Sequence, residues 1–368
     1  MRSWSATGEE LTVLILAGGT GGHVYPALAA AQRLQQQGCR VVWLGTRRGL
    51  EAKVVPAQGI ELHYVRISGL RGKGWVSWAW SPLKLVVALG QCLWQVMRLR
   101  PQVVLGMGGF VAGPGGLAAW LMHRPLLIHE QNAIPGWTNR FLARLACEVL
   151  EAFPGSFPPR FRARHTGNPV RSRIVALPPP NDRLAGRGNG PLRLLVLGGS
   201  QGARVLNAVV PPALAALRGA VVVAVRHQVG PEQLEPTRRY YRAVAVDGEL
   251  VPFIEDMAEA YGWADVVLCR AGAMTIAELA AAGAASILVP FPFAVDDHQT
   301  ANARYLAERG AALLVPQREL TSTRLCTLLR EFDQARSRLL EMASRARALA
   351  IPDATLLVAS RCMEAAYG

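Results

Sequence analysis

Short continuous apolar runs alternate along the first half of the chain with longer stretches of helical spacing. Residues 11–16 form an apolar run that enters a glycine-rich turn, residues 25–37 follow with helical spacing, and residues 41–44 form a second apolar run. Continuous apolar strands between helices are typical of a parallel sheet that is covered on both faces. The first half is therefore predicted to be an α/β domain of the Rossmann-like class.

The second half repeats this order of elements. An apolar run at 194–197 is followed by a glycine turn at 198–202 and by a helical stretch within 203–216. The first turn is Leu-Ala-Gly-Gly-Thr-Gly-Gly and the second is Val-Leu-Gly-Gly-Ser-Gln-Gly, and such self-similarity indicates two structurally similar domains. At 368 residues the chain is long enough for two domains, each with its own core.

Proline and glycine mark the junction of the two halves. Residues 178–191 are rich in both, which is the composition of an interdomain linker. We expect an N-terminal domain over 1–175 and a C-terminal domain over 176–350, with the linker over 176–192. Ligands of open parallel sheets bind at the carboxyl ends of the strands, so the cleft between the domains is the expected binding site.

Three glycine-rich segments follow predicted strands, at 18–22, 106–116 and 198–202. Glycine lets backbone N–H groups approach an anion that the next helix N-terminus also attracts, so the three segments favour phosphate binding over ligand-free tight turns. A dinucleotide site has less support, because no acidic residue stands about 20 positions beyond the first turn. Arg47 and Arg48 follow there, which leaves a site for a phosphorylated dinucleotide open.

The composition is globular and basic. Apolar residues make up 51% of the chain, charged residues 18%, and the formal net charge is +14, which suits phosphates, anionic lipid headgroups or nucleic acid. The basic residues are dispersed and no RNP, helix-turn-helix or zinc-finger pattern occurs, so nucleic acid is not an expected partner. The six cysteines lack C-x-x-C spacing and the first ten residues lack the features of a secretory signal, so we expect a reducing cytosol and no zinc site.

The stretch 75–97 is the one candidate for a membrane segment. Pro82 and Lys84 interrupt it, and it falls short of the ~20 uninterrupted apolar residues that a spanning helix needs. Its tryptophans stand among basic residues, a pattern that serves interfacial membrane binding but also fits a helix packed in a core. The apolar members are Trp75, Val76, Trp78, Trp80, Leu83, Leu85 and Trp94, and the basic members are Arg71, Lys73, Lys84, Arg98 and Arg100.

Seven segments, in order along nearly the whole chain, carry a specific resemblance. They are residues 17–23 (Ala-Gly-Gly-Thr-Gly-Gly-His), 69–74 (Gly-Leu-Arg-Gly-Lys-Gly), 106–116, 129–132 (His-Glu-Gln-Asn), 166–171 (Thr-Gly-Asn-Pro-Val-Arg), 198–203 and 271–278. In this combination the chain resembles the MurG family of cell-wall glycosyltransferases. The resemblance implies an α/β fold of GT-B architecture, in which two Rossmann-like parallel-sheet domains face a central cleft and the final helix, here 351–368, crosses back onto the first domain.

The resemblance also implies an activity. It is the inverting transfer of N-acetylglucosamine (GlcNAc) from UDP-GlcNAc to the C4 hydroxyl of the N-acetylmuramyl (MurNAc) pentapeptide of undecaprenyl-pyrophosphoryl lipid I, which makes lipid II for peptidoglycan, cell shape and division. Such an enzyme would bind peripherally to the anionic cytoplasmic face of the inner membrane, use no cofactor, and is compatible with a cell-wall synthesis complex. The alternatives are another GT-B UDP-sugar transferase, a UDP-GlcNAc epimerase, or a module that only binds a nucleotide sugar.

For the donor, the resemblance places UDP-GlcNAc on the second domain. Backbone amides at Ala273, Met274 and Thr275 would face the diphosphate, and the carboxylate of Glu278 can accept both hydroxyls of a ribose diol, unless it merely lies on a solvated helix face. The remaining donor contacts implied by the resemblance are Ser200 to a phosphate, the backbone of Ile254 to uracil, Gln299 to the sugar hydroxyls, and Asn132 and Arg171 from the first domain and the linker. The fixed cation of Arg171 can also offset the charge on a departing UDP.

For the acceptor, the candidate base is His23. A direct displacement must remove a proton from the attacking hydroxyl, and a helix N-terminus disfavours the protonated imidazole, so the ring remains a base near neutral pH. The alternative is that His23 only hydrogen-bonds the acceptor or caps the turn. Thr20 and the amides of Gly21 and Gly22 would position the lipid diphosphate.

The sequence Asp296-Asp297-His298 has the residue types of a divalent metal site. It follows Pro290-Phe291-Pro292 and precedes an apparent helix, where aspartate is an ordinary N-cap. We therefore expect no metal, as in the family that the chain resembles.

Overall fold

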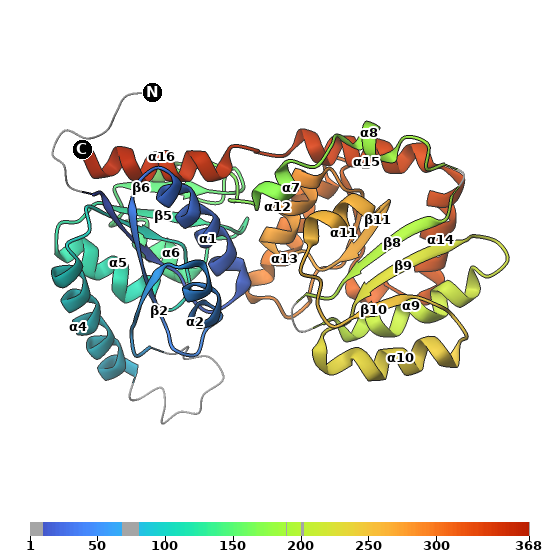
Figure 1. Ribbon diagram of the computed structural model, residues 1–368, viewed down its shortest axis with the longest axis horizontal. Helices are drawn as coiled ribbons and strands as arrows, with labels where there is room; N and C mark the ends of the chain where they lie inside the picture. Colours follow the sequence, from blue (N-terminus) through green and yellow to red (C-terminus); the bar gives the residue numbers. More distant parts are fainter. Residues whose placement is uncertain (1–9, 68–80, 189, 200–201, 368) are drawn as a thin grey trace. The chain divides into compact units, whose positions relative to one another are not determined.

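The computed structural model describes residues 10–67, 81–188, 190–199 and 202–367. The chain divides into two compact units, the first made of Met1–Pro169 with Asp353–Gly368 and the second of Val170–Pro352 (Figure 1). This division places residues 170–175, and the helix α7 (Ser172–Val175) among them, with the second unit.

The described part of the first unit contains a seven-stranded sheet in the order β3-β2-β1-β4-β5-β6-β7, and every neighbouring pair is parallel. The prediction of a parallel sheet with intervening helices is confirmed. The strands are β1 (Thr12–Leu16), β2 (Arg40–Gly45), β3 (Glu61–Tyr64), β4 (Val103–Gly106), β5 (Leu126–Glu130), β6 (Glu148–Glu151) and β7 (Arg164–His165). The helices are α1 (Gly21–Gln36), α2 (Glu51–Val54), α4 (Ser81–Leu99), α5 (Ala112–Leu121), α6 (Trp137–Leu142) and α16 (Ala354–Tyr367), with short 3₁₀ turns at Pro56–Gln58 and Pro159–Phe161.

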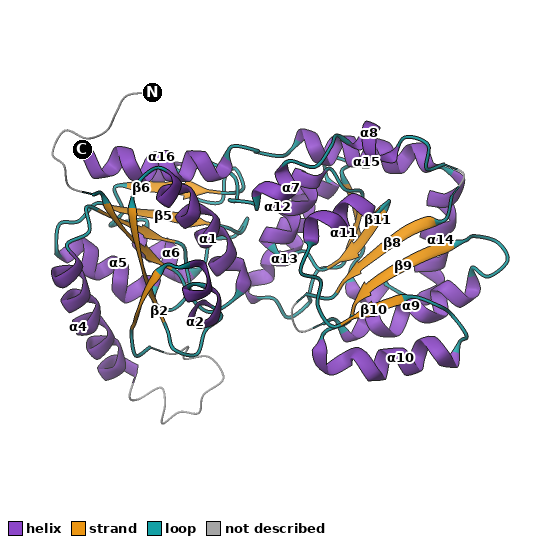
Figure 2. Ribbon diagram, in the orientation of Figure 1, coloured by secondary structure: helices purple, strands orange, loops and turns teal. Residues whose placement is uncertain are grey.

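Successive residues of β1 point to opposite faces of this sheet, which explains why residues 13–16 are all apolar. Val13 and Ile15 pack with α1 and α16, whereas Leu14 and Leu16 pack with α4, α5 and α6. Each fully buried aliphatic side chain contributes about 1.5–3 kcal/mol. Both faces of the sheet therefore carry a core, and the helices cover them (Figure 2).

The last helix, α16, belongs to the first unit although it ends the chain. Its buried residues Val358, Ala359 and Cys362 belong to the same core cluster as the buried residues of α1. Nε of Arg361 donates one bifurcated hydrogen bond to the two carboxylate oxygens of Glu148, at 2.8 and 2.9 Å, and so ties α16 to the start of β6. This helix completes one face of the first sheet.

The described part of the second unit contains a six-stranded parallel sheet in the order β10-β9-β8-β11-β12-β13. The strands are β8 (Leu192–Leu197), β9 (Val223–Gln228), β10 (Glu249–Val251), β11 (Val266–Cys269), β12 (Ser286–Leu288) and β13 (Ala312–Leu314). The helices are α7, α8 (Pro180–Leu184), α9 (Arg204–Ala216), α10 (Leu234–Ala243), α11 (Met257–Trp263), α12 (Ala273–Ala282), α13 (His298–Ala307), α14 (Ser322–Gln334) and α15 (Arg336–Ala348), with 3₁₀ turns at Pro231–Gln233, Val295–Asp297 and Gln317–Glu319.

The predicted similarity of the two halves is confirmed at the level of the strands and turns. Each sheet has its first strand inside it, next to the second strand on one side and the fourth on the other, and a helix is the next element after each first strand. The helix predicted from residue 25 begins earlier, at Gly21, because the carbonyl of Thr20 accepts from the amides of His23 and Val24, both at 3.1 Å. Gly21 and Gly22, which the sequence analysis assigned to the turn, therefore lie in the first turn of α1.

Candidate active site

The first glycine turn joins β1 to α1 at the carboxyl edge of the first sheet. Thr20 occupies the N-cap position with an extended backbone, and its side chain makes no capping bond. Within the described part of the chain, no protein group accepts from the backbone amides of Gly21 and Gly22. Two donors and the positive end of the helix dipole are therefore available to an anion at this turn.

The buried carboxylate of Glu51 stabilises this turn by accepting hydrogen bonds. The sequence analysis did not identify Glu51 as part of the site. One oxygen accepts from the amide of Gly19 at 2.9 Å, and the other accepts from the amide and hydroxyl of Thr46 at 2.9 and 2.7 Å. A Cβ on Gly49 would lie 2.0 Å from this carboxylate, so that glycine makes room for it. The amide of Gly19 is thus engaged in holding the turn, which leaves the amides of Gly21 and Gly22 for a ligand.

The second glycine-rich segment, 106–116, lies against the first turn. A Cβ on Gly109 would lie 2.2 Å from the carbonyl oxygen of Gly18, and a Cβ on Gly108 would lie 2.7 Å from Nδ1 of His23. Gly115 and Gly116 lie in α5, where an added Cβ would meet the side chains of Leu16 and Leu142. Close packing thus accounts for four glycines of this segment that the sequence assigned to phosphate binding.

His23 lies in the first turn of α1 and reaches the end of β5. Its Nδ1 is 2.8 Å from Oε1 of Gln131, and Nε2 of Gln131 is 3.1 Å from Nδ1 of His129. Nε2 of His129 is 2.9 Å from the carbonyl oxygen of Gly167. Burial lowers the pKa of His129 to about 4, although the Gly167 carbonyl and the charge of Glu130 act in the opposite direction.

The buried carboxylate of Glu130 organises the loop that carries Asn132. It accepts from the amide and the side-chain nitrogen of Asn132 at 2.9 and 3.1 Å, and from the amide of Gly136 at 3.1 Å. It also accepts from Nδ2 of Asn139 at 2.9 Å. The His-Glu-Gln-Asn segment therefore places Asn132 and Gln131 at the same edge of the sheet as His23.

In the second unit, Glu278 lies one turn into α12. This helix has Gly272 at its N-cap, no side-chain cap and no acidic residue in its first turn, so the amides of Ala273, Met274 and Thr275 are left for a ligand within the described part of the chain. Glu278 is not on a solvated face, because its side chain is only 12% exposed.

Two neighbours fix the carboxylate of Glu278. Nη2 of Arg171 lies 2.8 Å from Oε1, and the hydroxyl of Tyr261 donates to Oε2 at 3.2 Å. Burial, reinforced by the charge of Glu278, raises the pKa of Tyr261 well above its usual value, so its hydroxyl remains a donor. The structure thus brings Arg171 and Glu278 together, and it adds Tyr261, which the sequence analysis did not single out.

Gln228, at the end of β9, links the glycine-rich segment at 198–202 to the segment that holds Ile254. It donates to the carbonyl of Gly199 at 2.8 Å and accepts from the amide of Ile254 at 3.2 Å. The amide of Ile254 is therefore engaged, which leaves its carbonyl for a base. Ser200 lies outside the described residues, as do Gln201 and the segment 69–74.

Gln299 is the second residue of α13 and accepts from the amide of Phe291 at 2.9 Å. Arg270, which follows β11, holds the same segment by donating to the carbonyls of Val289 and Pro290 at 3.1 and 3.3 Å. The carboxylate of Asp297 accepts from the hydroxyl of Thr300 at 2.7 Å, and Asp297 stands at the N-cap of α13 without a capping bond to the backbone. Among the described residues, no group of three or more His, Cys, Asp or Glu side chains is arranged to hold a metal ion.

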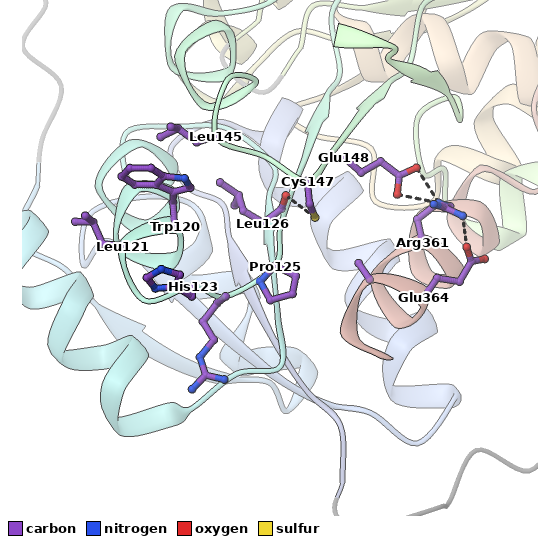
Figure 3. A pocket seen from close by; sticks show the side chains of 12 residues that line it. Trp120, Leu121, His123, Pro125, Leu126, Leu145, Cys147, Glu148, Arg361 and Glu364 are labelled. Carbon is purple, nitrogen blue, oxygen red and sulfur yellow. Dashed lines mark hydrogen bonds and ion pairs between the residues drawn. The ribbon is translucent and has the colours of Figure 1, made fainter. Parts of the chain in front are cut away.

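A cavity of about 790 Å³ lies elsewhere in the first unit, between the end of α5 and α16 (Figure 3). Trp120 and Leu121 line one side, and the Arg361–Glu148 ion pair lies on the other. Leu126 and Glu148 begin β5 and β6, so this cavity lies at the amino edge of the sheet, opposite the glycine turns. It is therefore not the site that the sequence motifs assemble.

The predicted apolar and basic surface is exposed where the structure describes it. Leu83, Leu85 and Trp94 project from α4 with more than half of each side chain exposed, and Arg98 stacks over Trp94 with its guanidinium 5.2 Å from the ring centroid. Trp75, Val76, Trp78, Trp80, Arg71 and Lys73 lie outside the described residues. Over the part that the structure describes, no helix has the length and hydropathy to cross a bilayer.

Both units match domain models of the same protein family. The model of the glycosyltransferase family 28 N-terminal domain matches residues 13–151, and that of the family's C-terminal domain matches residues 193–357. A protein of Nitrosococcus oceani named UDP-N-acetylglucosamine–N-acetylmuramyl-(pentapeptide) pyrophosphoryl-undecaprenol N-acetylglucosamine transferase is 56% identical, over 97% of this chain and 99% of its own. A protein of the same name from Marinobacter nauticus is 54% identical, over 96% of this chain and 98% of its own.

A solved structure agrees. The crystal structure of Acinetobacter baumannii MurG superimposes with a TM-score of 0.84 at 42% identity, covering 96% of this chain and 99% of the other. The fold is therefore GT-B, with two Rossmann-like parallel-sheet domains.

Proposed function

The chain belongs to glycosyltransferase family 28, and on that premise we propose that it transfers GlcNAc from UDP-GlcNAc to a lipid-linked MurNAc-pentapeptide. The names of relatives that match it over nearly their whole length support transfer rather than epimerisation or binding alone. The observation that carries the donor assignment is the fixed, mostly buried carboxylate of Glu278, one turn beyond the uncapped N-terminus of α12.

The donor would bind through complementary groups of the second unit. The amides of Ala273, Met274 and Thr275 and the positive end of α12 attract the diphosphate. The two oxygens of Glu278 each accept one bond from Arg171 or Tyr261 and keep a lone pair for a ribose hydroxyl. Arg171, whose side chain is 44% exposed, carries a fixed positive charge that can stabilise the charge on departing UDP. Ser200, Asn132, the carbonyl of Ile254 and Gln299 are the remaining proposed donor contacts.

His23 would act on the acceptor. In an inverting displacement its neutral imidazole takes the proton from the C4 hydroxyl as that oxygen attacks the anomeric carbon and the bond to UDP breaks. Thr20 and the amides of Gly21 and Gly22 would hold the acceptor diphosphate beside it. This single step inverts the configuration at the anomeric carbon and transfers the hydroxyl proton to His23. It requires no metal or cofactor.

The lipid part of the acceptor brings the first unit to a membrane surface. The exposed side chains of α4 lie beside an apolar groove of about 320 Å³ that is lined by residues of α4, α5 and α6, among them Leu85, Pro114 and Phe141. Apolar and aromatic groups flanked by arginine suit the headgroup region of an anionic bilayer. We therefore assign the chain to the cytoplasmic face of the inner membrane as a peripheral protein.

The test is release of UDP from UDP-GlcNAc, with and without a short-chain lipid-linked MurNAc-pentapeptide and with EDTA present. We expect acceptor-dependent, EDTA-resistant release that His23→Ala and Glu278→Gln each abolish. His63→Ala is the matched control, because His63 lies on the edge strand β3, where it pairs with the half-exposed carboxylate of Glu61. No release with any acceptor would reduce the protein to a UDP-sugar-binding module and overturn the proposed function.

A further inference from the structure

His23, Gln131 and His129 form a chain of hydrogen bonds. Two backbone carbonyls determine which atom donates and which accepts in each bond of this chain. The first carbonyl is that of Gly167, which can only accept, so Nε2 of His129 at 2.9 Å carries the proton. Burial lowers the pKa of His129 to about 4, so the ring is neutral near pH 7 and its Nδ1 has a lone pair. Nδ1 of His129 is therefore an acceptor.

The second carbonyl orients the side-chain amide of Gln131. The carbonyl oxygen of His129 lies 3.0 Å from Nε2 of Gln131, and Nδ1 of His129 lies 3.1 Å from the same nitrogen. The two N–H groups of the amide satisfy both acceptors, whereas a flipped amide would set its oxygen against a carbonyl oxygen and a lone pair. Asn168 holds the backbone of this residue in place, because its Nδ2 donates to the carbonyl of Gln131 at 3.0 Å.

The oxygen of this oriented amide is what His23 meets. Oε1 of Gln131 lies 2.8 Å from Nδ1 of His23 and can only accept, so the neutral ring of His23 must donate from Nδ1. We propose that Gln131 and His129 are positioning residues that fix His23 in the Nδ1–H tautomer and leave its Nε2 unprotonated to take up a proton. Free histidine favours the opposite, Nε2–H tautomer, so the network reverses the intrinsic preference.

The close approach of Gly108 supports the same orientation. A Cβ at this residue would lie 2.7 Å from Nδ1 and 2.8 Å from Cε1 of His23, so only glycine leaves the ring in reach of Gln131. A base whose tautomer and direction are fixed before substrate binds does not pay for that ordering during the reaction. This role rests on the proposed function in one respect, that Nε2 of His23 faces the acceptor hydroxyl.

The direct test needs no variant of the network. The full-length protein is labelled with ¹⁵N-histidine, and the two ring nitrogens of His23 are identified by the signals that His23→Gln removes. At pH 8 we expect Nδ1 of His23 to be protonated and Nε2 to be bare. An Nε2–H tautomer, or averaging between both tautomers, would overturn the proposal whatever the activity.

Kinetics then separate positioning from folding. Gln131→Met removes the oxygen but keeps the length of the side chain, so we expect averaging of the His23 tautomers and a loss of about tenfold or more in kcat, with the KM for UDP-GlcNAc unchanged. A Gln131→Met protein that keeps the wild-type tautomer would contradict the proposal.

The two proposals fail in different ways. An Nδ1–H tautomer together with full transfer by His23→Gln would sink the base assigned under the proposed function and leave the positioning network standing. Transfer that depends on His23 together with an Nε2–H tautomer would sink the network alone.

Discussion

Gly108→Ala probes the contact between the two glycine-rich segments of the first unit. The residue has a φ of +96°, and a Cβ there would lie 2.7 Å from Nδ1 of His23. That is roughly 0.7 Å inside ordinary van der Waals contact, so the ring must move by about this distance. A shift of that size is enough to break the 2.8 Å hydrogen bond between His23 and Gln131.

Two effects of different kinds are expected. The positive φ costs an alanine about 1–2 kcal/mol, which appears in the free energy of unfolding. Displacement of a catalytic group by 1 Å can cost about 100-fold in rate, so we expect kcat for GlcNAc transfer to fall by about 10- to 100-fold. The KM for UDP-GlcNAc should not change, because the donor binds to the second unit.

Gly38→Ala is the matched control. Its φ of +82° is similar, it lies in the same unit, and a Cβ there would meet nothing within 4 Å. Urea unfolding and initial rates of UDP release would be measured on both variants. If Gly108→Ala loses stability like Gly38→Ala and keeps the wild-type kcat, the argument that Gly108 makes room for the ring of His23 is refuted.

Three further predictions follow from buried charges and pairs. Burial lowers the pKa of His129 to about 4 and of His227 to about 3, so below the unfolded value of 6.5 only the unfolded chain takes up these protons. The free energy of unfolding should therefore fall between about pH 6.5 and 4 by up to about 1.4 kcal/mol per pH unit for each histidine, and a urea midpoint equal at pH 7.5 and 5 would contradict this. Glu51→Gln leaves one oxygen for two sets of donors and puts its NH2 against the amide of either Gly19 or Thr46, so we expect a loss of about 1–3 kcal/mol and a lower Tm, and an unchanged Tm would count against it. Arg361→Met removes the pair with Glu148, so amide exchange in α16 should quicken while exchange in α12 does not, and equal exchange in α16 would disprove the tie.

The sequence could predict the sheets because their signal is local. The first strand of each sheet is mostly apolar, as in 13–16 and 194–197, and glycines follow each of these two strands. Burial on both faces demands such runs, so the parallel arrangement follows from the composition of single strands. The exact start of α1 could not be predicted, because Gly21 and Gly22 suit a helix N-terminus as well as a turn.

The candidate site was only partly predictable, because its partners are remote in sequence. Glu51 resembles any acid in a short helix, and only the folded chain brings it to Gly19, 32 residues away. Gln131 was part of a recognised segment, yet its partner His23 is 108 residues away. Tyr261 lay in an unremarkable apolar stretch, and no local pattern relates it to Glu278.

The glycines of 106–116 show the limit of a motif. Their number suggested phosphate binding, but Gly115 and Gly116 let α5 pack against Leu16 and Leu142. Glycine frees the backbone for a ligand and for a close neighbour alike, and the sequence does not distinguish these uses.

The most direct test of the central claim is the structure of the product of one turnover. UDP-GlcNAc labelled with ¹³C in the sugar would be incubated with a short-chain lipid-linked MurNAc-pentapeptide and the wild-type protein, and the new linkage would be determined by NMR. Single displacement with His23 as the base requires that the α-linked sugar of the donor becomes a β-linked GlcNAc on the C4 oxygen of MurNAc. An α-linked product, or free GlcNAc in place of a glycosylated acceptor, would contradict the account.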